Sequence, residues 1–307
     1  MLNTYIYIYE LFAMAVFNIL KMDYPVYEGV GLPKMATFLE NPGKTIQNIQ
    51  DLKLGPDAVI LATFPRSGTH WVYEIVHMLH NKEANYATKS REAVFLEGLS
   101  DLGPLQSYNQ VVSTHLPFQW IPKQHLETGG KIIHVIRNPK DVAVSLYKFL
   151  VSCNSIEETF EEFLFGYFLK EEVMYGGWFD YNKAFIRESE ARKDQIIMLQ
   201  YEKLQRNTKE ELKRLAKFLN VKDAEPLLED IAEKCSFDSL KSAEKTSQND
   251  DTMSDIMKSI HRKNNPTVYR KGKIGDWKNH FTVAMSETFD KAYADNMRNV
   301  ALDIDFV

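Results

Sequence analysis

The first residues that could do chemistry form a polar break in an apolar stretch, Phe64-Pro65-Arg66-Ser67-Gly68-Thr69. A β-branched run precedes the break and apolar residues at helical spacing follow it, which predicts a strand, a tight loop and a helix. The glycine permits a close ligand approach, and the serine and threonine can cap the helix. Free N–H groups at a helix start bind phosphate, and the arginine adds a cation. An ordinary capped turn explains the same pattern, so the break alone leaves both interpretations open.

Three further polar side chains follow predicted strands. His115 ends the run at 110–115, Arg137 follows the run at 131–136, and Tyr201 follows a run that ends at Gln200. In open parallel sheets, ligands bind beyond the carboxyl ends of the strands. The sequence therefore predicts one ligand site made by the loop at 64–69 and these three residues.

The elements that must position these residues alternate between strand and helix. Further helical patterns lie near 139–151, 156–172, 178–191 and 208–219, and a last helix begins near Thr282. Asn138 and Thr282 are predicted N-caps, and Thr208 with Glu211 is a predicted capping box. Alternating strands and helices favour parallel pairing with right-handed crossovers. The predicted fold is α/β: a single three-layer domain with a central parallel sheet and a P-loop-like strand-loop-helix.

Composition excludes several classes of function. The chain has 307 residues, and its 42 carboxylates and 37 Lys and Arg give a net charge of -5, which argues against a general binder of nucleic acid or acidic membranes. The two cysteines, Cys153 and Cys235, make neither a disulfide scaffold nor a multi-cysteine zinc site, which fits a reducing compartment. The eight histidines lack metal-binding spacing, so we expect no metal.

Two segments stand apart from the predicted domain core. Residues 1–22 form an apolar N-terminal extension of a domain at 23–307. No Lys or Arg precedes this run and Glu10 interrupts it, so packing on the domain or on a partner is expected rather than a signal peptide or membrane anchor. Residues 241–267 are polar and nearly free of aromatic residues, so we expect a mobile surface lid.

The phosphate loop is not a Walker A motif. That motif needs a glycine where Thr63 stands and a lysine where Thr69 stands. No strand ends in a clear magnesium-binding aspartate either, so a nucleotide triphosphatase or an ordinary kinase is disfavoured.

Five sequence motifs resemble those of one protein family. The segments TFPRSGTHW, THLP, RNPKDVAVS, RKGKIGDWK and KNHFTVAMSE are similar, in order and spacing, to the cytosolic sulfotransferases. That family transfers a sulfonate group from 3'-phosphoadenosine 5'-phosphosulfate (PAPS) to hydroxyl or amine acceptors without a metal. The resemblance covers the chain from about Tyr24 almost to the C-terminus. It implies a PAPS-dependent enzyme of the cytoplasm with PAPS as co-substrate.

The resemblance also implies the residues of the site. The 5' end of PAPS would be held by Arg66, Ser67, Gly68, Thr69, His70 and Trp71. The 3'-phosphate would be bound by Arg137, Ser145, Arg270, Lys271 and Gly272, and the adenine would be lined by Tyr201, Cys235 and Phe237. A guanidinium fork suits phosphate geometry, which supports the role of Arg137.

His115 is the candidate general base, because an imidazole that is neutral near pH 7 can take the acceptor proton. Arg66 is the second candidate catalytic residue, since it can hydrogen-bond the oxygen of the leaving phosphate. Three residues depart from the usual family pattern: Arg66 and Ser113 where lysines are common, and His70 where threonine is common. We therefore expect slow turnover or an unusual acceptor.

The acceptor and the assembly are the least determined by the sequence. Phe149 would face the acceptor, and aromatic walls favour phenols or steroids. The positions Lys278, Thr282, Val283 and Glu287 match a short dimerisation motif of the family, whose alternative is a capped surface helix. Two alternatives to a sulfotransferase are a PAPS- or PAP-binding protein with weak or lost catalysis and, less favoured, a nucleotide kinase.

Overall fold

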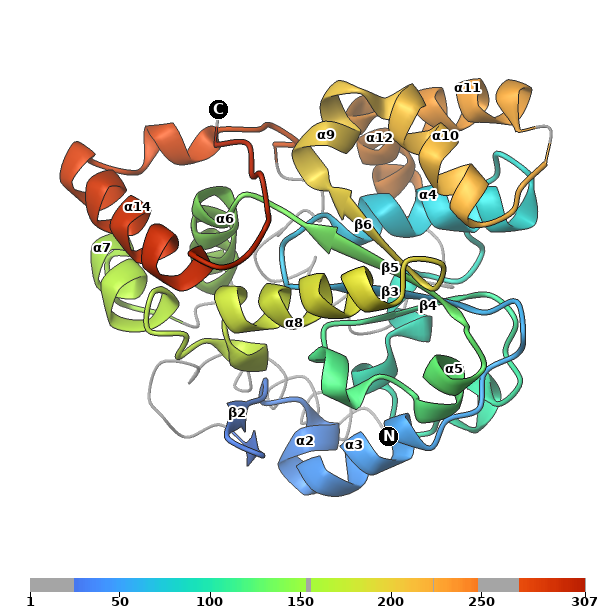
Figure 1. Ribbon diagram of the computed structural model, residues 1–307, viewed down its shortest axis with the longest axis horizontal. Coiled ribbons are helices and arrows are strands. Elements are labelled where there is room, and N and C mark those ends of the chain that lie inside the picture. The colour runs from blue at the N-terminus through green and yellow to red at the C-terminus, as the bar shows by residue number, and fades with distance from the viewer. Residues whose placement is uncertain (1–24, 153–155, 223, 248–270, 307) are drawn as a thin grey trace.

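The computed structural model describes residues 25–152, 156–222, 224–247 and 271–306 (Figure 1). The predicted extension at 1–22, Cys153, Arg270 and the part of the predicted lid from 248 onward lie outside the described residues. Residues 241–247, at the start of that predicted lid, belong to a helix that begins at Phe237.

A four-stranded parallel sheet forms the centre of the domain. Its strands are β3 (Val59–Thr63), β4 (Val111–Thr114), β5 (Lys131–Ile136) and β6 (Ile196–Gln200), in the order β4-β3-β5-β6. All three pairings are parallel, which confirms the predicted sheet. The strands are almost wholly buried, as expected for a parallel sheet covered on both faces.

Helices cover the sheet and extend beyond it. Those that adjoin the strands are α4 (Thr69–Asn81), α6 (Pro139–Ser152), α8 (Trp178–Ala191), α9 (Tyr201–Arg206) and α10 (Thr208–Phe218). The others are α2 (Ala36–Glu40), α3 (Pro42–Gln50), α5 (Lys123–Glu127), α7 (Phe160–Phe163), α11 (Glu225–Lys234), α12 (Phe237–Ser247) and α14 (Val283–Met297). A short antiparallel hairpin, β1 (Val26–Tyr27) with β2 (Val30–Gly31), precedes them.

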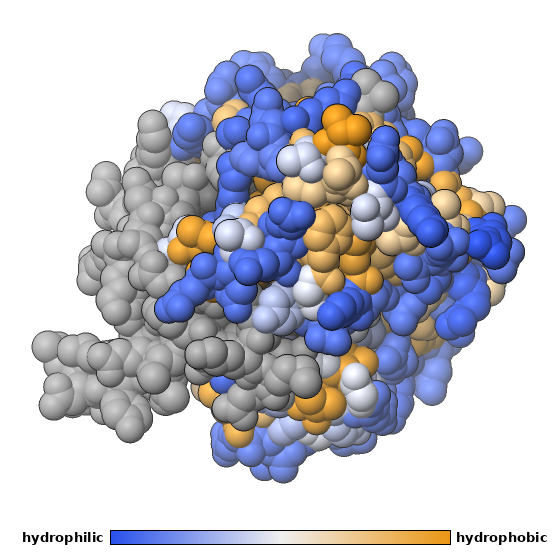
Figure 2. Space-filling model, turned by 90° about the vertical axis from the view of Figure 1, so that its left-hand side faces the viewer, coloured by the Kyte–Doolittle hydropathy of each residue, from blue (hydrophilic) through white to orange (hydrophobic). Residues whose placement is uncertain are grey.

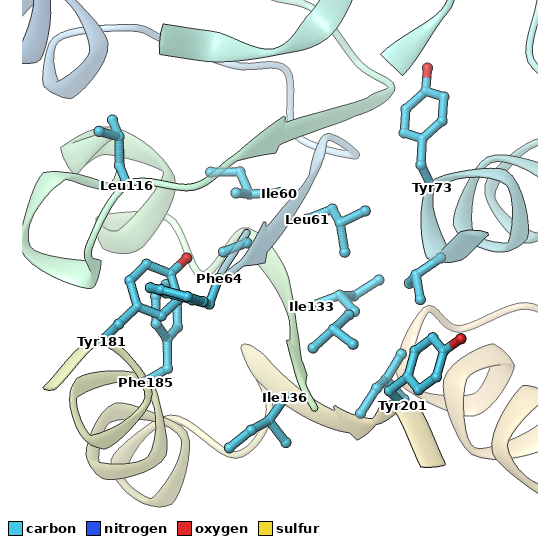
Figure 3. Close-up of a cluster of buried hydrophobic side chains, with 14 of the residues drawn as sticks. Ile60, Leu61, Phe64, Tyr73, Leu116, Ile133, Ile136, Tyr181, Phe185 and Tyr201 are labelled. Atoms are coloured by element: carbon cyan, nitrogen blue, oxygen red, sulfur yellow. The ribbon is translucent and has the colours of Figure 1, made fainter. Parts of the chain in front are cut away.

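The core has two sides because successive strand residues point to opposite faces of a sheet. Helices α4 and α8 lie on opposite sides of the strands, as right-handed crossovers require (Figure 1). Figure 3 shows Phe64 directed toward Tyr181 and Phe185 of α8, with ring centroids of Phe64 and Tyr181 5.5 Å apart. Leu61 points to the other side, toward Tyr73 of α4. The predicted α/β fold is confirmed, with the phosphate loop between β3 and α4.

Some predicted helix boundaries are confirmed and others are wrong. Asn138 and Thr282 accept hydrogen bonds from the first turns of α6 and α14. The capping box at Thr208 is wrong: Asn207 is the N-cap of α10, and the Thr208 hydroxyl donates to the carbonyl of Leu204. This hydroxyl faces the end of α9, a contact that the local sequence pattern does not indicate.

The predicted helix at 156–172 is shorter and less regular than its pattern suggested. It begins after Thr159, which forms a capping box with Glu162, and α7 continues as a π-helical turn at Leu164–Phe168. The aromatic side chains of this segment pack against α6 and α14, for example Phe168 against Phe289. Tertiary packing therefore sets the helix end here.

Candidate active site

The loop between β3 and α4 has an unusual backbone. Arg66 and Gly68 both have positive φ values, 69° and 95°. A Cβ on Gly68 would lie 2.7 Å from Cδ2 of Tyr201, so the position needs glycine for both conformation and space. Gly68 is also the N-cap of α4, and no side chain caps this helix. The expectation that Ser67 or Thr69 caps it is therefore wrong, and the first N–H groups of α4 have no intrahelical acceptor.

The Thr69 hydroxyl contacts Thr63 instead of capping the helix. The two hydroxyl oxygens lie 2.6 Å apart. The backbone carbonyl of Thr63 also accepts a hydrogen bond of 2.7 Å from Nδ1 of His115. One residue at the end of β3 thus joins the phosphate loop to His115, the candidate base, which directly follows β4.

Two strand-loop-helix units meet at Arg66. Its Nε donates to Oγ of Ser145 over 3.2 Å, and its carbonyl accepts from Nη1 of Arg137 over 2.9 Å. The Arg66 guanidinium also lies 5.0 Å from the ring centre of Phe149. The sequence assigned these residues to three separate places: the 5' end, the 3'-phosphate and the acceptor. In the structure they adjoin one another.

An aromatic group lies beside this cluster. The rings of Trp71 and Tyr201 meet edge to face at 5.2 Å, and the Arg137 guanidinium stacks 4.4 Å over Tyr201 (Tyr201 is labelled in Figure 3). The Trp71 indole donates to the carbonyl of Cys235 over 2.9 Å. The start of α4 and the end of α11 are thereby tied together.

The segment after 271 reaches the same region. A Cβ on Gly272 would overlap the ring of Phe237, so these two predicted residues are in contact. Lys271 donates to Asp276 over 2.7 Å, and its side chain is 42% exposed. Arg270 lies outside the described residues.

The cluster contains polar atoms that suit an anionic ligand. Oγ of Ser67 and Nε of Arg137 are buried and have no hydrogen-bond partner among the described residues. A buried donor without a partner costs about 1–3 kcal/mol, which an anion would recover. Together with the N-terminus of α4, these donors fit a phosphate group.

His115 itself is more constrained than its sequence context indicates. Because Nδ1 donates to Thr63, Nε2 carries the lone pair, and it accepts a hydrogen bond of 2.8 Å from Nη2 of Arg91. Burial of the imidazole and the Arg91 charge hold the pKa of His115 well below its ordinary value. The side chain is therefore neutral at pH 7, as expected, but a weaker base than an exposed histidine.

Sequence reasoning missed four residues around His115. Glu97 accepts the His115 backbone N–H over 2.6 Å, and burial raises the pKa of Glu97 to about 7. The ring of Tyr175, a residue with a φ of 66°, lies 5.8 Å from the imidazole. Arg91 and Glu92 complete the group. A glutamate inside the apolar run AVFLEG was the available signal for Glu97, whereas nothing in the local sequence marked Arg91.

The His70 side chain contacts Glu92. Its Nε2 lies 2.7 Å from Oε1 of Glu92. Burial opposes ionisation of Glu92, yet contacts with His70 and Arg91 lower its pKa to about 2. The Nε2 atom of His70 is therefore engaged by Glu92.

The predicted dimer segment lies on the surface. Thr282 caps α14, the Val283 side chain is 75% exposed, and Lys278 and Glu287 are exposed. Figure 2 shows the face of the molecule that carries α7 and α14, where apolar surface lies among hydrophilic side chains.

The described residues contain no group of three or more His, Cys, Asp or Glu side chains that could hold a metal ion. None of their helices is long and apolar enough to cross a membrane.

Fold and site together define an α/β protein in which a strand-loop-helix at the end of a parallel sheet carries donors that fit a phosphate. The family model described as a sulfotransferase domain matches residues 56–301. The chain therefore belongs to the sulfotransferase family and is an enzyme of that family, as its motifs predicted.

Named relatives agree with this assignment. Sulfotransferase 1E1 of Bos taurus is 32% identical over 89% of this chain and 92% of its own, and the Homo sapiens protein of that name is 34% identical over 83% and 88%. Among solved structures, mouse sulfotransferase SULT7A1 complexed with PAP has a TM-score of 0.70 and 26% identity, covering 89% of this chain and 94% of that one. A retinol dehydratase complexed with retinol and PAP shares the fold, with a TM-score of 0.69, 22% identity and coverage of 86% and 88%.

Proposed function

We propose that this enzyme transfers the sulfonate group of PAPS to a hydroxyl, or an amine, of a small acceptor, with His115 as general base. The observation that carries the proposal is the position of Thr63, which contacts both Thr69 of the phosphate loop and His115. A PAPS molecule bound by the loop and an acceptor beside His115 would therefore lie close together at the strand ends. In-line transfer needs such an arrangement.

The donor follows from the family, and PAPS supplies a sulfonate activated by a phosphate leaving group. Backbone N–H groups at the start of α4, with Ser67, would bind its 5' end. Arg137 and Ser145 would bind the 3'-phosphate, and Trp71, Tyr201 and Phe237 would line the adenine. The unpartnered atoms of Ser67 and Arg137 support this assignment.

The chemical step assigns a role to two side chains. The acceptor oxygen forms a bond to sulfur while the bond between sulfur and the bridging oxygen breaks, and PAP leaves with the electron pair. His115 takes the acceptor proton at Nε2, and Arg66 stabilises the charge on the departing oxygen. Arg66 now bonds Ser145, so it would have to turn toward the bridging oxygen to do so.

The acceptor should be flat and apolar apart from its hydroxyl. Phe149, Tyr175 and Phe95 lie around Arg66 and His115 and provide aromatic surface. Phenols or steroids suit such walls. The retinol in the retinol dehydratase structure is consistent with a small apolar acceptor.

PAP release from PAPS, measured with a panel of phenols, sterols and amines, tests the proposal. We expect acceptor-dependent release without added metal. The alternative, a PAPS-binding protein with lost catalysis, is favoured by one observation, since Arg91 occupies Nε2 of His115. PAP binding by calorimetry with no release on any acceptor would support that alternative. Thermal protection by ATP with magnesium but not by PAP would instead indicate a kinase.

The proposal also covers the oligomeric state and the cellular location. We propose a weak homodimer through the segment from Lys278 to Glu287, where Val283 is exposed. A contact of this size falls short of the roughly 1,600 Å² of a standard interface, so the dimer should exchange. We also propose the cytoplasm as its location, in keeping with the low cysteine content.

A further inference from the structure

The contact between Arg91 and His115 bears on which acceptors can react, and the inference drawn from it rests on the proposed function. Arg91 lies on a 3₁₀ turn, Arg91–Val94, outside the sheet. Its Nη2 donates to Nε2 of His115 over 2.8 Å, the atom that would receive the acceptor proton. A guanidinium has no acceptor atom and keeps its proton at ordinary pH, so Arg91 can only be the donor.

Arg91 is held firmly in this place. Its side chain is 8% exposed, its guanidinium lies 4.0 Å over the ring of Phe95, and Nη1 lies 3.8 Å from Glu92. Phe95 in turn pairs with Ser113 of β4, which fixes the turn against the strand that directly precedes His115. A cation therefore reaches His115 from this turn.

The charges around His115 leave the site electropositive. Arg66 of the loop and His70 of α4 face His115 from one direction. Arg91 and Glu92 face it from the 3₁₀ turn, and Glu97 faces it from the following turn at Leu96–Gly98. Tyr175 faces it from the turn at Met174–Gly176. Glu92 is shared with His70 at 2.7 Å, and Glu97 is partly protonated near pH 7 because burial raises its pKa to about 7. Neither carboxylate fully neutralises Arg91.

Proton transfer to His115 is therefore difficult unless the acceptor gives its proton up easily. A protonated His115 beside Arg91 would put two cations in contact in a buried place. A negative oxygen placed between Arg91 and His115, by contrast, would be stabilised by the guanidinium. Both effects favour an acceptor whose hydroxyl is already acidic.

We propose that Arg91 is a positioning residue that makes this enzyme select acidic hydroxyls, phenols rather than aliphatic alcohols. It acts through His115 by occupying Nε2 until an acceptor oxygen replaces it. The oxygen then lies next to a fixed positive charge, and little basicity is needed from the imidazole.

Matched acceptors test the selection directly. Sulfonation of 4-nitrophenol and of 4-nitrobenzyl alcohol compares a phenol with an aliphatic alcohol of similar shape. We expect kcat/KM to be at least about 100-fold higher for the phenol, which is within the range of one proton-transfer contribution. Across a series of phenols, kcat/KM at saturating PAPS should rise with the acidity of the phenol.

Variants separate the charge of Arg91 from its packing. Arg91→Met should reduce the preference for the phenol at least about tenfold and move the acidic limb of the pH profile of kcat/KM to higher pH, because removing a cation favours protonated His115. Arg91→Lys should restore most of the preference. Lys89→Met removes an exposed cation from the same segment, over Tyr108, and should change neither quantity.

The outcomes distinguish this inference from the proposed function. Transfer to neither acceptor nor to any other would overturn the proposed function and this inference with it. Equal transfer to both acceptors would overturn the inference alone. A uniform loss in Arg91→Met and Arg91→Lys, with an unchanged acceptor ratio and pH profile, would show a merely structural role and would also overturn it.

Discussion

Nε of Arg66 donates a hydrogen bond of 3.2 Å to Oγ of Ser145, so the loop after β3 is joined to the middle of α6. The two residues come from separate strand-loop-helix units, and the sequence assigned them to opposite ends of the donor. If the 3'-phosphate binds at Ser145 as proposed, we expect donor binding to change where the Arg66 side chain points.

Substitution of Arg66 tests its role at the leaving oxygen. Arg66→Met should lower kcat about 100-fold, since one donor aimed at a developing oxyanion contributes about 10² to 10³ in rate. Arg66→Lys keeps the charge and adds a group that can give up its proton, so kcat should equal or exceed the parent value. Steady-state PAP release with one acceptor measures both. A Lys variant as slow as the Met variant would contradict this role.

Substitution of His115 separates binding from chemistry. His115→Asn keeps a donor for the Thr63 carbonyl but removes the base, so kcat should fall about 10² to 10⁴-fold. The dissociation constant of PAP, measured by calorimetry, should change less than about threefold because no phosphate contact is lost. His80→Asn, an α4 histidine that bonds the Asp57 carbonyl, is the control and should leave kcat unchanged. Unaltered turnover in His115→Asn would remove it from the base role.

Arg137 should affect the donor and spare the acceptor. Arg137→Met removes the charge while retaining apolar packing on Tyr201, and a charged hydrogen bond contributes about 1.5–3 kcal/mol. The apparent KM for PAPS should rise about 10- to 100-fold, with that for the acceptor within about threefold. Arg192→Met, at the far end of α8, serves as the control. An effect confined to the acceptor constant would refute the 3'-phosphate assignment.

Glu74 should make the fold less stable at alkaline pH. Burial raises its pKa to about 7, and its side chain accepts the N–H of Ala87. The folded state holds this proton more tightly than the unfolded chain, so the stabilisation present below about pH 4.5 is lost as pH rises through about 7. Glu74→Gln keeps an acceptor oxygen and should raise the free energy of unfolding by about 1–3 kcal/mol at pH 8.

Urea unfolding at pH 5.5 and pH 8 measures this difference. The gain in Glu74→Gln should be clearly smaller at pH 5.5, where the parent carboxyl is largely protonated. Glu83→Gln changes an exposed glutamate of the same region and should show no pH-dependent difference. The same gain at both pH values would mean that the titration of Glu74 is not its cause.

Val283 provides a test of the dimer. Val283→Glu places a charge on an apolar side chain that is 75% exposed, and a small interface should not tolerate it. Light scattering after size exclusion at micromolar concentration should give a monomer for the variant and a larger mass for the parent, with PAP release retained. Val151→Glu, on another exposed apolar side chain, should leave the mass unchanged. A parent that is monomeric at all concentrations would disprove the dimer.

The sequence by itself determined the elements and the phosphate loop. Strand and helix periodicity, Asn138 and Thr282 as caps, and the break at 64–69 are local patterns, and local geometry follows from them. The carboxyl ends of parallel strands lie at one edge, so the convergence of the loop, His115, Arg137 and Tyr201 followed from topology alone.

Only the tertiary structure decided the environment of His115, the candidate base. Arg91, Glu97 and Tyr175 reach His115 from turns that carry no periodic signal, and their contacts depend on side-chain packing across distant segments. Helix ends at Thr208 and Phe168 moved for the same reason, because contacts with neighbouring helices override local propensity. His115 could be predicted as the candidate base from a motif, but its basicity depends on the buried Arg91 cation beside it, which is a property of the folded chain.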